Sequence, residues 1–330
     1  MTSSGLPSVG IVGLGQIGGS IALDLAGRSR VSFYARSRTA QEAGTSAGFR
    51  LCGTLEELSA QSEIIFIAVP VDQSVDVIES LMGHLVPGQI VTDVGSTKHS
   101  LMKWADEAHW PDSVEFIGGH PMAGSDISGF AGARKGLFEE RTWILTPGAV
   151  ASNGRADALL RLIQLITSGL HARVGVMDSS THDQAVAKAS HLEHLIALAL
   201  VSLVRGSGEQ SMISRMVAGS FKDATRVCKS SGSMVVPFLV ENGYLPNILN
   251  QFKAEIDEIA KVLQDRTALT GMWEVNSRWR QEIEGTSVEC SSVSIARGRD
   301  SADELKRLTL EGRLVCSVDP SEGELIVEIC

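Results

Sequence analysis

Three glycines near the N-terminus place the strongest constraint on the fold. Residues 9–12 form an apolar run typical of a buried strand, and Gly13, Gly15 and Gly18 follow it. The apolar pattern of residues 21–26 is then typical of a helix. In such a strand–turn–helix unit the first glycine permits the tight turn, the second lets a pyrophosphate approach the backbone, and the third lets helix and strand pack closely. The segment therefore predicts a dinucleotide-binding unit.

The rest of the N-terminal half alternates apolar runs with helical patterns. We expect strands over residues 31–34, 63–69, 89–93, 114–117, 142–145 and 172–177. Nearly continuous apolar strands between helices are typical of a parallel sheet covered on both faces. After Asp178 the pattern changes to long helices, and from Glu282 it changes to short strands around one helix. We therefore predict an α/β Rossmann domain over residues 1–177, an all-α domain over 178–281 and a small α+β appendage over 282–330.

Charge and cysteine usage narrow the range of partners. The formal net charge of -10 argues against nucleic acid or an anionic membrane as the main partner, because phosphate binding needs a basic face. The five cysteines are scattered without a CxxC pair, which predicts free thiols in a reducing cytosol. Residues 1–8 lack the features of a secretory signal. The apolar run 195–204 is about half the length of a membrane span, so we expect a buried helix in a cytoplasmic protein.

The residues after the second predicted strand bear on the choice of cofactor. NAD-binding domains place an acid there, which holds the ribose 2′-hydroxyl. Residues 34–38 read Tyr-Ala-Arg-Ser-Arg and contain no acid. Two arginines and a serine can hold a 2′-phosphate through charge-assisted hydrogen bonds, so we expect NADP rather than NAD, the alternative being a solvated turn. We predict that the cofactor is bound by Gly13, Gly15, Gln16, Ile17, Gly18, Arg36, Ser37, Arg38, Val69 and Pro70.

Two loops that follow predicted strands carry the candidate catalytic residues. Ser96 follows the strand 89–93, at the carboxyl edge of the sheet where ligands bind in such folds, and it can hydrogen-bond a substrate hydroxyl. Lys98 nearby is equally typical of a surface lysine at the start of a helix. His120 lies in a glycine-rich loop after the next strand. Its imidazole can accept a proton near neutral pH, so we predict that His120 is a catalytic base.

The predicted helical domain carries two further groups of polar residues. Three- and four-residue spacing puts His191 and His194 on one helical face and Asp183 and Ser190 on another. The two histidines lack a third ligand and the HExxH spacing, so we predict no metal site. Asp183 is also consistent with a first-turn acid stabilised by the helix dipole.

The second group is Lys222, Asp223 and Arg226. The spacing predicts that Lys222 and Arg226 share one helical face beside Asp223. Two cations suit a dicarboxylate substrate, because arginine can hold a carboxylate with two hydrogen bonds. The alternative is an ordinary pair of surface charges.

Five segments together resemble the prephenate/arogenate dehydrogenase family. They are GLGQIGGS, DVGSTK, GGHPMAGSD, THDQAVAKASHLEH and AGSFKDATRV, in that order. The resemblance covers roughly residues 9–230, and several motifs in order are more specific than a glycine fingerprint alone. It implies a Rossmann domain followed by an all-α dimerisation domain, and hence a homodimer.

The resemblance also implies a reaction, the NAD(P)-dependent oxidative decarboxylation of prephenate to 4-hydroxyphenylpyruvate. His120 would take the proton of the C4 hydroxyl as hydride leaves C4, and Ser96 would orient both groups. Because loss of CO2 creates an aromatic ring, the protein mainly supplies orientation and a base. The implied substrate-site residues are Arg226 for a carboxylate, Lys222 and Asp223 beside it, His194 in the wall, and Asp183 and Ser190 in support.

Two departures from the family pattern bear on the substrate. Glu193 replaces the proline of the family's SHLPH segment, and residues 230–236 lack the tryptophan and proline of its SDPxxW-like stretch. An extra carboxylate near the pocket favours a substrate with an amine, namely arogenate or 4-amino-4-deoxyprephenate. The alternative is that Glu193 faces solvent, because it lies off the face of His191 and His194.

Two other functions fit a Rossmann domain followed by helices. One is a reductase of the 3-hydroxyacid dehydrogenase or imine reductase type, and the other is a non-catalytic nucleotide-binding dimer. The HPMAGSD and FKDATR segments argue against the first. The presence of Ser96, His120 and Arg226 argues against the second.

Overall fold

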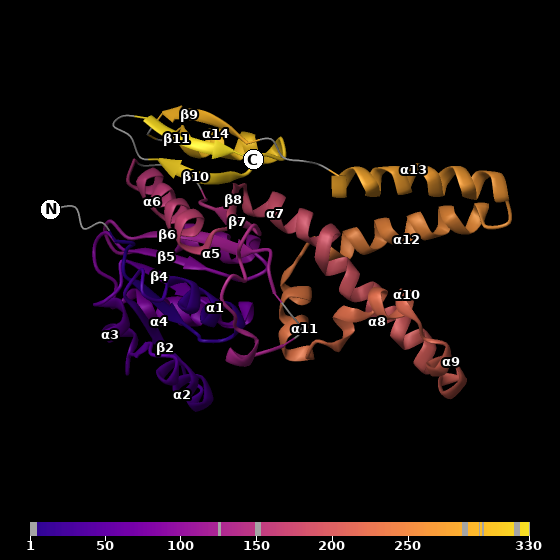
Figure 1. Ribbon diagram of the computed structural model, residues 1–330, viewed down its shortest axis with the longest axis horizontal. Helices are drawn as coiled ribbons and strands as arrows, with labels where there is room; N and C mark the ends of the chain where they lie inside the picture. The colour runs from indigo at the N-terminus through magenta and orange to yellow at the C-terminus, as the bar shows by residue number, and fades with distance from the viewer. Residues whose placement is uncertain are drawn as a thin grey trace.

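An α/β body and a helical arm make up the chain (Figure 1). The computed structural model describes residues 5–124, 127–148, 153–285, 290–296, 298, 300–319 and 324–329. The helices of the arm reach away from the sheet, and the C-terminal strands lie on the body rather than on the arm (Figure 1).

The first part of the sheet is parallel and has the strand order of a dinucleotide-binding domain. Its strands run in the order β3-β2-β1-β4-β5-β6. They are β1 (Val9–Val12), β2 (Val31–Tyr34), β3 (Arg50–Leu51), β4 (Ile64–Ile67), β5 (Ile90–Asp93) and β6 (Glu115–Pro121). The chain reverses its direction of travel across the sheet between β1 and β4, and ligands bind at such a switch point, outside the carboxyl ends of the strands.

Both faces of this sheet are buried, as the continuous apolar strands predict. Successive side chains of a strand point to opposite faces. In β4, Ile64 and Phe66 join one buried cluster, while Ile65 and Ile67 join the other. The helices and short turns of this body are α1 (Gln16–Leu25), α2 (Arg38–Ser46), α3 (Leu55–Ser59), η1 (Val71–Gln73), α4 (Ser74–Met82), α5 (His99–Glu107), η2 (Phe130–Gly132), α6 (Asn153–Gln164) and η3 (Leu165–Gly169).

The second part of the sheet departs from the parallel pattern. It contains β7 (Thr142–Thr146), β8 (Arg173–Val176), β9 (Ser291–Ala296), β10 (Val315–Asp319) and β11 (Glu324–Ile329). β7 runs antiparallel to β6. The described part of the connection between them holds only the short turn η2, and an antiparallel pair needs no crossover helix. The prediction of an entirely parallel sheet is therefore wrong beyond β6.

The C-terminal segment extends this same sheet. β10 pairs antiparallel with β8, and the order continues to β11 and β9. α14 (Ser301–Leu310) packs beside β8, where the Thr309 hydroxyl accepts a hydrogen bond from the Val176 amide at 2.8 Å. Buried Leu305 and Leu308 join the core of the α/β body. The segment predicted as an appendage is thus built into the body.

One long helix links the body to the arm. It comprises α7 (Ser179–Val186), the π-turn η4 (Ala187–His191) and α8 (Leu192–Gly206). This helix, 179–206, is long and apolar enough to cross a membrane by length and composition. Within one chain its apolar run is not buried as predicted, because Ala197 is the buried residue of α8 while Leu198 and Leu203 are 54% and 73% exposed. The arm continues with α9 (Gln210–Met216), α10 (Gly219–Ala224), η5 (Arg226–Lys229), α11 (Gly232–Glu241), α12 (Leu245–Val262) and α13 (Arg266–Gly285).

The cysteines follow the sequence prediction only in part. Cys52, Cys228 and Cys316 carry free thiols. Cys290, which directly precedes β9, is disulfide-bonded. The expectation of free thiols throughout is therefore wrong for Cys290.

Candidate active site

The glycine loop between β1 and α1 is shaped to receive a phosphate. Gly13 has a φ of +95°, and a Cβ there would lie 2.4 Å from the Ala68 carbonyl oxygen. A Cβ on Gly18 would lie 2.1 Å from the Gly13 carbonyl oxygen, so helix and strand meet without a side chain between them. At Gly15 a Cβ would point into open space. Gly15, which precedes α1, has no side chain that could cap the helix, and the amino end of a helix favours an anion.

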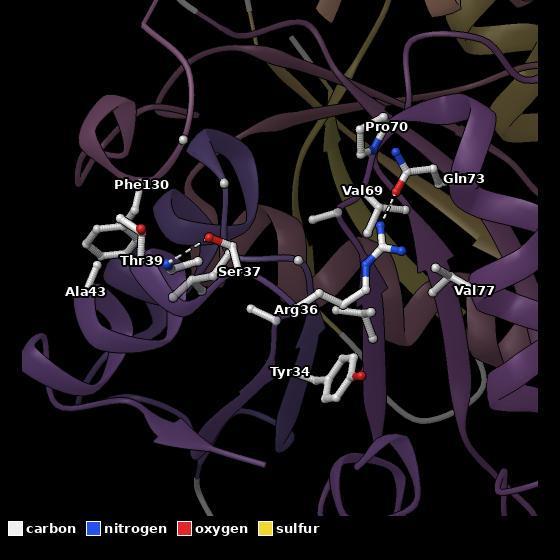
Figure 2. A pocket seen from close by; sticks show the side chains of 18 of the residues that line it. Tyr34, Arg36, Ser37, Thr39, Ala43, Val69, Pro70, Gln73, Val77 and Phe130 are labelled. Carbon is white, nitrogen blue, oxygen red and sulfur yellow. Dashed lines mark hydrogen bonds between the residues drawn. The ribbon is translucent and has the colours of Figure 1, made fainter. Parts of the chain in front are cut away.

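A cavity of about 850 Å³ opens beside this loop (Figure 2). Arg36, at the end of β2, lines it and donates a hydrogen bond to the Gln73 side chain across the cavity. Ser37 lines it as well and caps α2. Arg38 is outside the lining, and its guanidinium, 89% exposed, bonds Glu42 at 2.8 Å. Of the predicted 2′-phosphate ligands, only Arg36 and Ser37 therefore reach the cavity.

A second cavity, of about 880 Å³, adjoins the first and shares Gly15, Val69 and Pro70 with it. Gln16 and Ile17 of the predicted cofactor site line this second cavity, whereas Gly18 lines neither. Ser96 lines it from the loop after β5, and His120 lines it from near the end of β6. α11 and the residue before it contribute Ser231, Gly232, Ser233, Met234, Val236, Pro237 and Phe238. We call this second space the reaction cavity.

His120 lies near the end of β6, in the antiparallel pair with β7. Its Nδ1 lies 2.8 Å from Nε2 of His182, and the two rings meet edge to face with centroids 5.1 Å apart. Burial lowers the pKa of His120 well below 6.5, and nearby His182 and Lys98 lower it further. The imidazole is therefore neutral at pH 7 and able to accept a proton.

His182 and Asp183, in α7, form the layer behind His120. His182 Nδ1 lies 2.7 Å from Asp183 Oδ1. The Asp183 carboxylate also accepts the Lys98 amide at 2.8 Å and the His99 amide at 2.9 Å. Burial alone would raise the pKa of Asp183, but the hydrogen bonds from His182 and from the backbone of His99 and Lys98 hold it below its usual value. Asp183 thus lies behind His182 and away from the cavity lining.

His182 is a further residue of this site that was not among the predicted ones. The signal that was available is its place directly before Asp183, after a strand of the sheet. Burial lowers the pKa of His182, and the hydrogen bond to Asp183 opposes that shift. His182 is 1% exposed and connects His120 with Asp183.

Lys98 is fully buried, so its reading as a surface lysine is wrong. Its ammonium forms an ion pair with Asp93. The Asp93 carboxylate also accepts the Gly95 amide at 2.8 Å and the Gly119 amide at 3.1 Å. Burial lowers the pKa of Lys98, and the charge of Asp93 opposes that shift. The Asp93 carboxylate thus links Lys98, at the end of the Ser96 loop, to Gly119 of the strand that carries His120.

Phe238 of α11 is held in the wall of the reaction cavity by two histidines. His191 stacks on it with centroids 4.7 Å apart, and His194 meets it edge-on at 5.1 Å. His191 Nδ1 lies 3.0 Å from the Asn242 amide nitrogen, which also donates to the Asp183 carbonyl at 2.9 Å. Burial lowers the pKa of His191 to about 4.

The remaining residues of the long helix lie at the margin of the site. Ser190 contributes its backbone carbonyl, 3.0 Å from His194 Nδ1. Glu193 is exposed and outside the cavity lining, as the solvent-facing alternative predicts. In contrast, residues 231–234 and 236 line the cavity directly, and they belong to the stretch 230–236 that departs from the family pattern.

The basic group before α11 is exposed. Lys222 and Asp223 belong to α10, which ends at Ala224, while Arg226 begins the separate turn η5. The hydroxyl of Thr225 bonds the Phe221 carbonyl at 2.6 Å at this break. The prediction that Lys222 and Arg226 share one helical face is therefore wrong, and none of the three lines the reaction cavity.

Family comparisons agree with this architecture. The family described as "Prephenate dehydrogenase, nucleotide-binding domain" matches residues 21–190. The family described as "Prephenate dehydrogenase, dimerization domain" matches residues 178–272. The two matches meet at α7, the helix that carries His182 and Asp183.

Individual relatives extend the match over most of the chain. The prephenate dehydrogenase of Lactococcus lactis is 31% identical over 83% of this chain and 77% of its own. The solved Synechocystis arogenate dehydrogenase is 26% identical, with a TM-score of 0.70 over 84% of this chain and 99% of its own. A. aeolicus prephenate dehydrogenase, solved with hydroxyphenyl propionate and NAD+, is 25% identical, with a TM-score of 0.76 over 86% of this chain and 100% of its own. The chain belongs to the prephenate dehydrogenase family of NAD(P)-dependent oxidoreductases.

Proposed function

We propose that this enzyme oxidatively decarboxylates prephenate to 4-hydroxyphenylpyruvate with His120 as the base. The observation that carries the proposal is the position of His120 in the reaction cavity, directly beside the cavity at the glycine loop. A substrate in the reaction cavity would thus have its C4 between an imidazole and a nicotinamide. Family membership argues against the 3-hydroxyacid dehydrogenase or imine reductase alternative.

His120 accepts the proton of the C4 hydroxyl, whose O–H bond breaks as the C4–oxygen double bond forms. A nicotinamide bound in the adjoining cavity would supply the acceptor for the hydride that leaves C4. The electron pair of the bond to the ring carboxylate then enters the ring as CO2 departs. Ser96, which lines the same cavity, orients the hydroxyl toward His120. General-base catalysis of this kind typically contributes about 10²–10⁴-fold to the rate.

We infer that NADP is the preferred cofactor. Arg36 and Ser37 line the cavity at the end of β2, where an NAD-binding domain would present an acid. The guanidinium and the hydroxyl suit a 2′-phosphate.

We propose that Arg226 binds a substrate carboxylate and that Lys222 and Asp223 shape its surroundings. The Arg226 guanidinium is exposed in η5, which leads into the cavity wall α11, and no described residue pairs with it.

The enzyme acts as a homodimer, because the arm exposes large apolar side chains that one chain leaves uncovered. They include Leu198, Leu203, Met212, Met216, Ile256, Leu263, Trp273, Val275, Trp279 and Ile283.

A substrate that bears an amine is the second candidate. Asp72 is the acidic residue among the described residues that line the reaction cavity, and no lysine or arginine is among them. A carboxylate without a neighbouring cation favours an ammonium group, as in arogenate or 4-amino-4-deoxyprephenate. Asp72, rather than Glu193, is thus the residue that would select such a substrate.

The test is reduction of the cofactor, followed at 340 nm, with prephenate, arogenate and 4-amino-4-deoxyprephenate, each with NAD and NADP. Fast turnover of prephenate supports the first candidate. Turnover confined to an amino substrate, and lost in Asp72→Asn, supports the second. Absence of turnover with all three substrates, in a protein that binds the cofactor, would refute both. His120→Asn is the control for background reduction.

A further inference from the structure

Three side chains are linked by hydrogen bonds behind the reaction cavity. Asp183 Oδ1 lies 2.7 Å from His182 Nδ1, and His182 Nε2 lies 2.8 Å from His120 Nδ1. Asp183 and His182 are each 1% exposed. Bulk water therefore does not compete for either hydrogen bond, and the neighbouring protein groups decide where each proton lies.

The Asp183 carboxylate sets the direction of both hydrogen bonds between these three side chains. An ionised carboxylate can only accept, and Asp183 already accepts the amides of Lys98 and His99. His182 Nδ1 must therefore carry a hydrogen. A neutral imidazole has one donor and one acceptor, so Nε2 of His182 is an acceptor. His120 Nδ1 must then donate to it.

This order of donors leaves one atom of His120 for the substrate. With the hydrogen on Nδ1, Nε2 carries the free lone pair. No described residue forms a hydrogen bond with Nε2, and His120 lines the reaction cavity. The nitrogen that can accept a proton is thus the one left to face a bound hydroxyl.

We propose that His182 is a positioning residue that locks His120 in the tautomer with its hydrogen on Nδ1, so that Nε2 is the base. The catalytic part of this inference rests on the proposed function, whereas the tautomer is a property of the free enzyme. When Nε2 takes the substrate proton, Nδ1–H continues to donate to His182, whose ring stays oriented by Asp183. A wrong tautomer in a comparable histidine–aspartate arrangement of another enzyme costs about 10⁴-fold in rate.

The tautomer can be measured directly without substrate. The probe is nitrogen-15 NMR of the ring atoms in the full-length enzyme labelled at histidine, with His120 assigned from His120→Asn. We expect Nδ1–H in the wild type and loss of that single state in His182→Leu. A hydrogen on Nε2 of His120 in the wild type, or an unchanged tautomer in His182→Leu, would overturn the inference.

Kinetics separate positioning from a structural role. We expect His182→Leu to lower kcat about 100-fold with little change in KM, within the range of general-base catalysis. His182→Gln should recover at least about tenfold of that loss, because its amide oxygen can accept from His120 Nδ1. The exposed His84, replaced in His84→Gln, is the matched control. Equal losses in the leucine and glutamine variants would contradict the inference.

Substrate turnover and the NMR tautomer distinguish a failure of the proposed function from a failure of the role of His182. If the wild type turns over none of the three substrates, the proposed function fails, while the NMR tautomer still decides the role of His182. Cofactor affinity and circular dichroism check that each variant is folded. Should His182→Leu fail to fold, the wild-type tautomer and the kinetics of His182→Gln decide the matter.

Discussion

Lys98 and Asp93 form an ion pair with side chains 0% and 1% exposed, directly beneath the loop that carries Ser96. Removing one partner of a buried pair leaves an uncompensated charge, which costs about 3–5 kcal/mol. We therefore expect Lys98→Met to lower the free energy of unfolding by about this amount, measured by urea denaturation. The double variant Lys98→Met/Asp93→Asn should recover part of the loss. A single variant as stable as the wild type would contradict this.

The pH dependence of activity should reflect the lowered pKa of His120. Burial keeps the imidazole neutral well below pH 6.5, with His182, Lys98 and His191 acting in the same direction. We expect kcat/KM to stay level as the pH falls to 6.5 and to decline only below it, where His120 becomes protonated. An acid limb centred at or above pH 6.5 would argue against His120 as the base of the free enzyme.

Cofactor selectivity should depend on Arg36. A guanidinium bonds a 2′-phosphate but has no such partner in NAD, so Arg36→Gln should raise the Kd of NADP about tenfold and leave that of NAD nearly unchanged, corresponding to about 1.4 kcal/mol. Calorimetric titration of both cofactors measures the change. The exposed Arg30, replaced in Arg30→Gln, is the control for net charge. Equal effects on the two cofactors would exclude a 2′-phosphate contact.

Stability should fall in acid because of His191. The folded protein protonates this ring only near pH 4, whereas the unfolded chain does so near 6.5. Between these values the unfolded state binds more protons, so the free energy of unfolding decreases as the pH falls from about 6.5 to about 4, by about 3 kcal/mol from this group. Urea denaturation at several pH values should show a shallower decrease in His191→Gln than in the wild type. The control His84→Gln should keep the full decrease.

The association of two chains should depend on the exposed tryptophans of α13. Trp279 is 63% exposed, and aromatic residues are typical hot spots of interfaces. We expect Trp279→Lys to raise the dimer Kd at least about 30-fold, as for a hot spot of about 2 kcal/mol, in sedimentation equilibrium. Gln281→Lys on the same helix adds the same charge away from the face of Trp279 and should leave the dimer intact. Identical behaviour of the two variants would place the interface elsewhere.

Local patterns were sufficient for much of the fold. The continuous apolar runs predicted the strands of the body, because burial on both faces leaves a direct mark on composition. Antiparallel β7 was not predictable in the same way, since its direction depends on whether a crossover helix precedes it. The break between Lys222 and Arg226 was also missed, because helical spacing alone does not show where a helix ends.

The sequence by itself determined the cofactor loop, the order of the motifs and the selection of His120 as the candidate base. Glycine geometry and the ends of strands are encoded by neighbouring residues. Only the tertiary structure decided that His182, 62 positions away, bonds His120, and that Lys98 is buried against Asp93. It also decided that the apolar face of α8 stays exposed in one chain. These relationships depend on which distant elements pack together, and a local pattern carries no record of that packing.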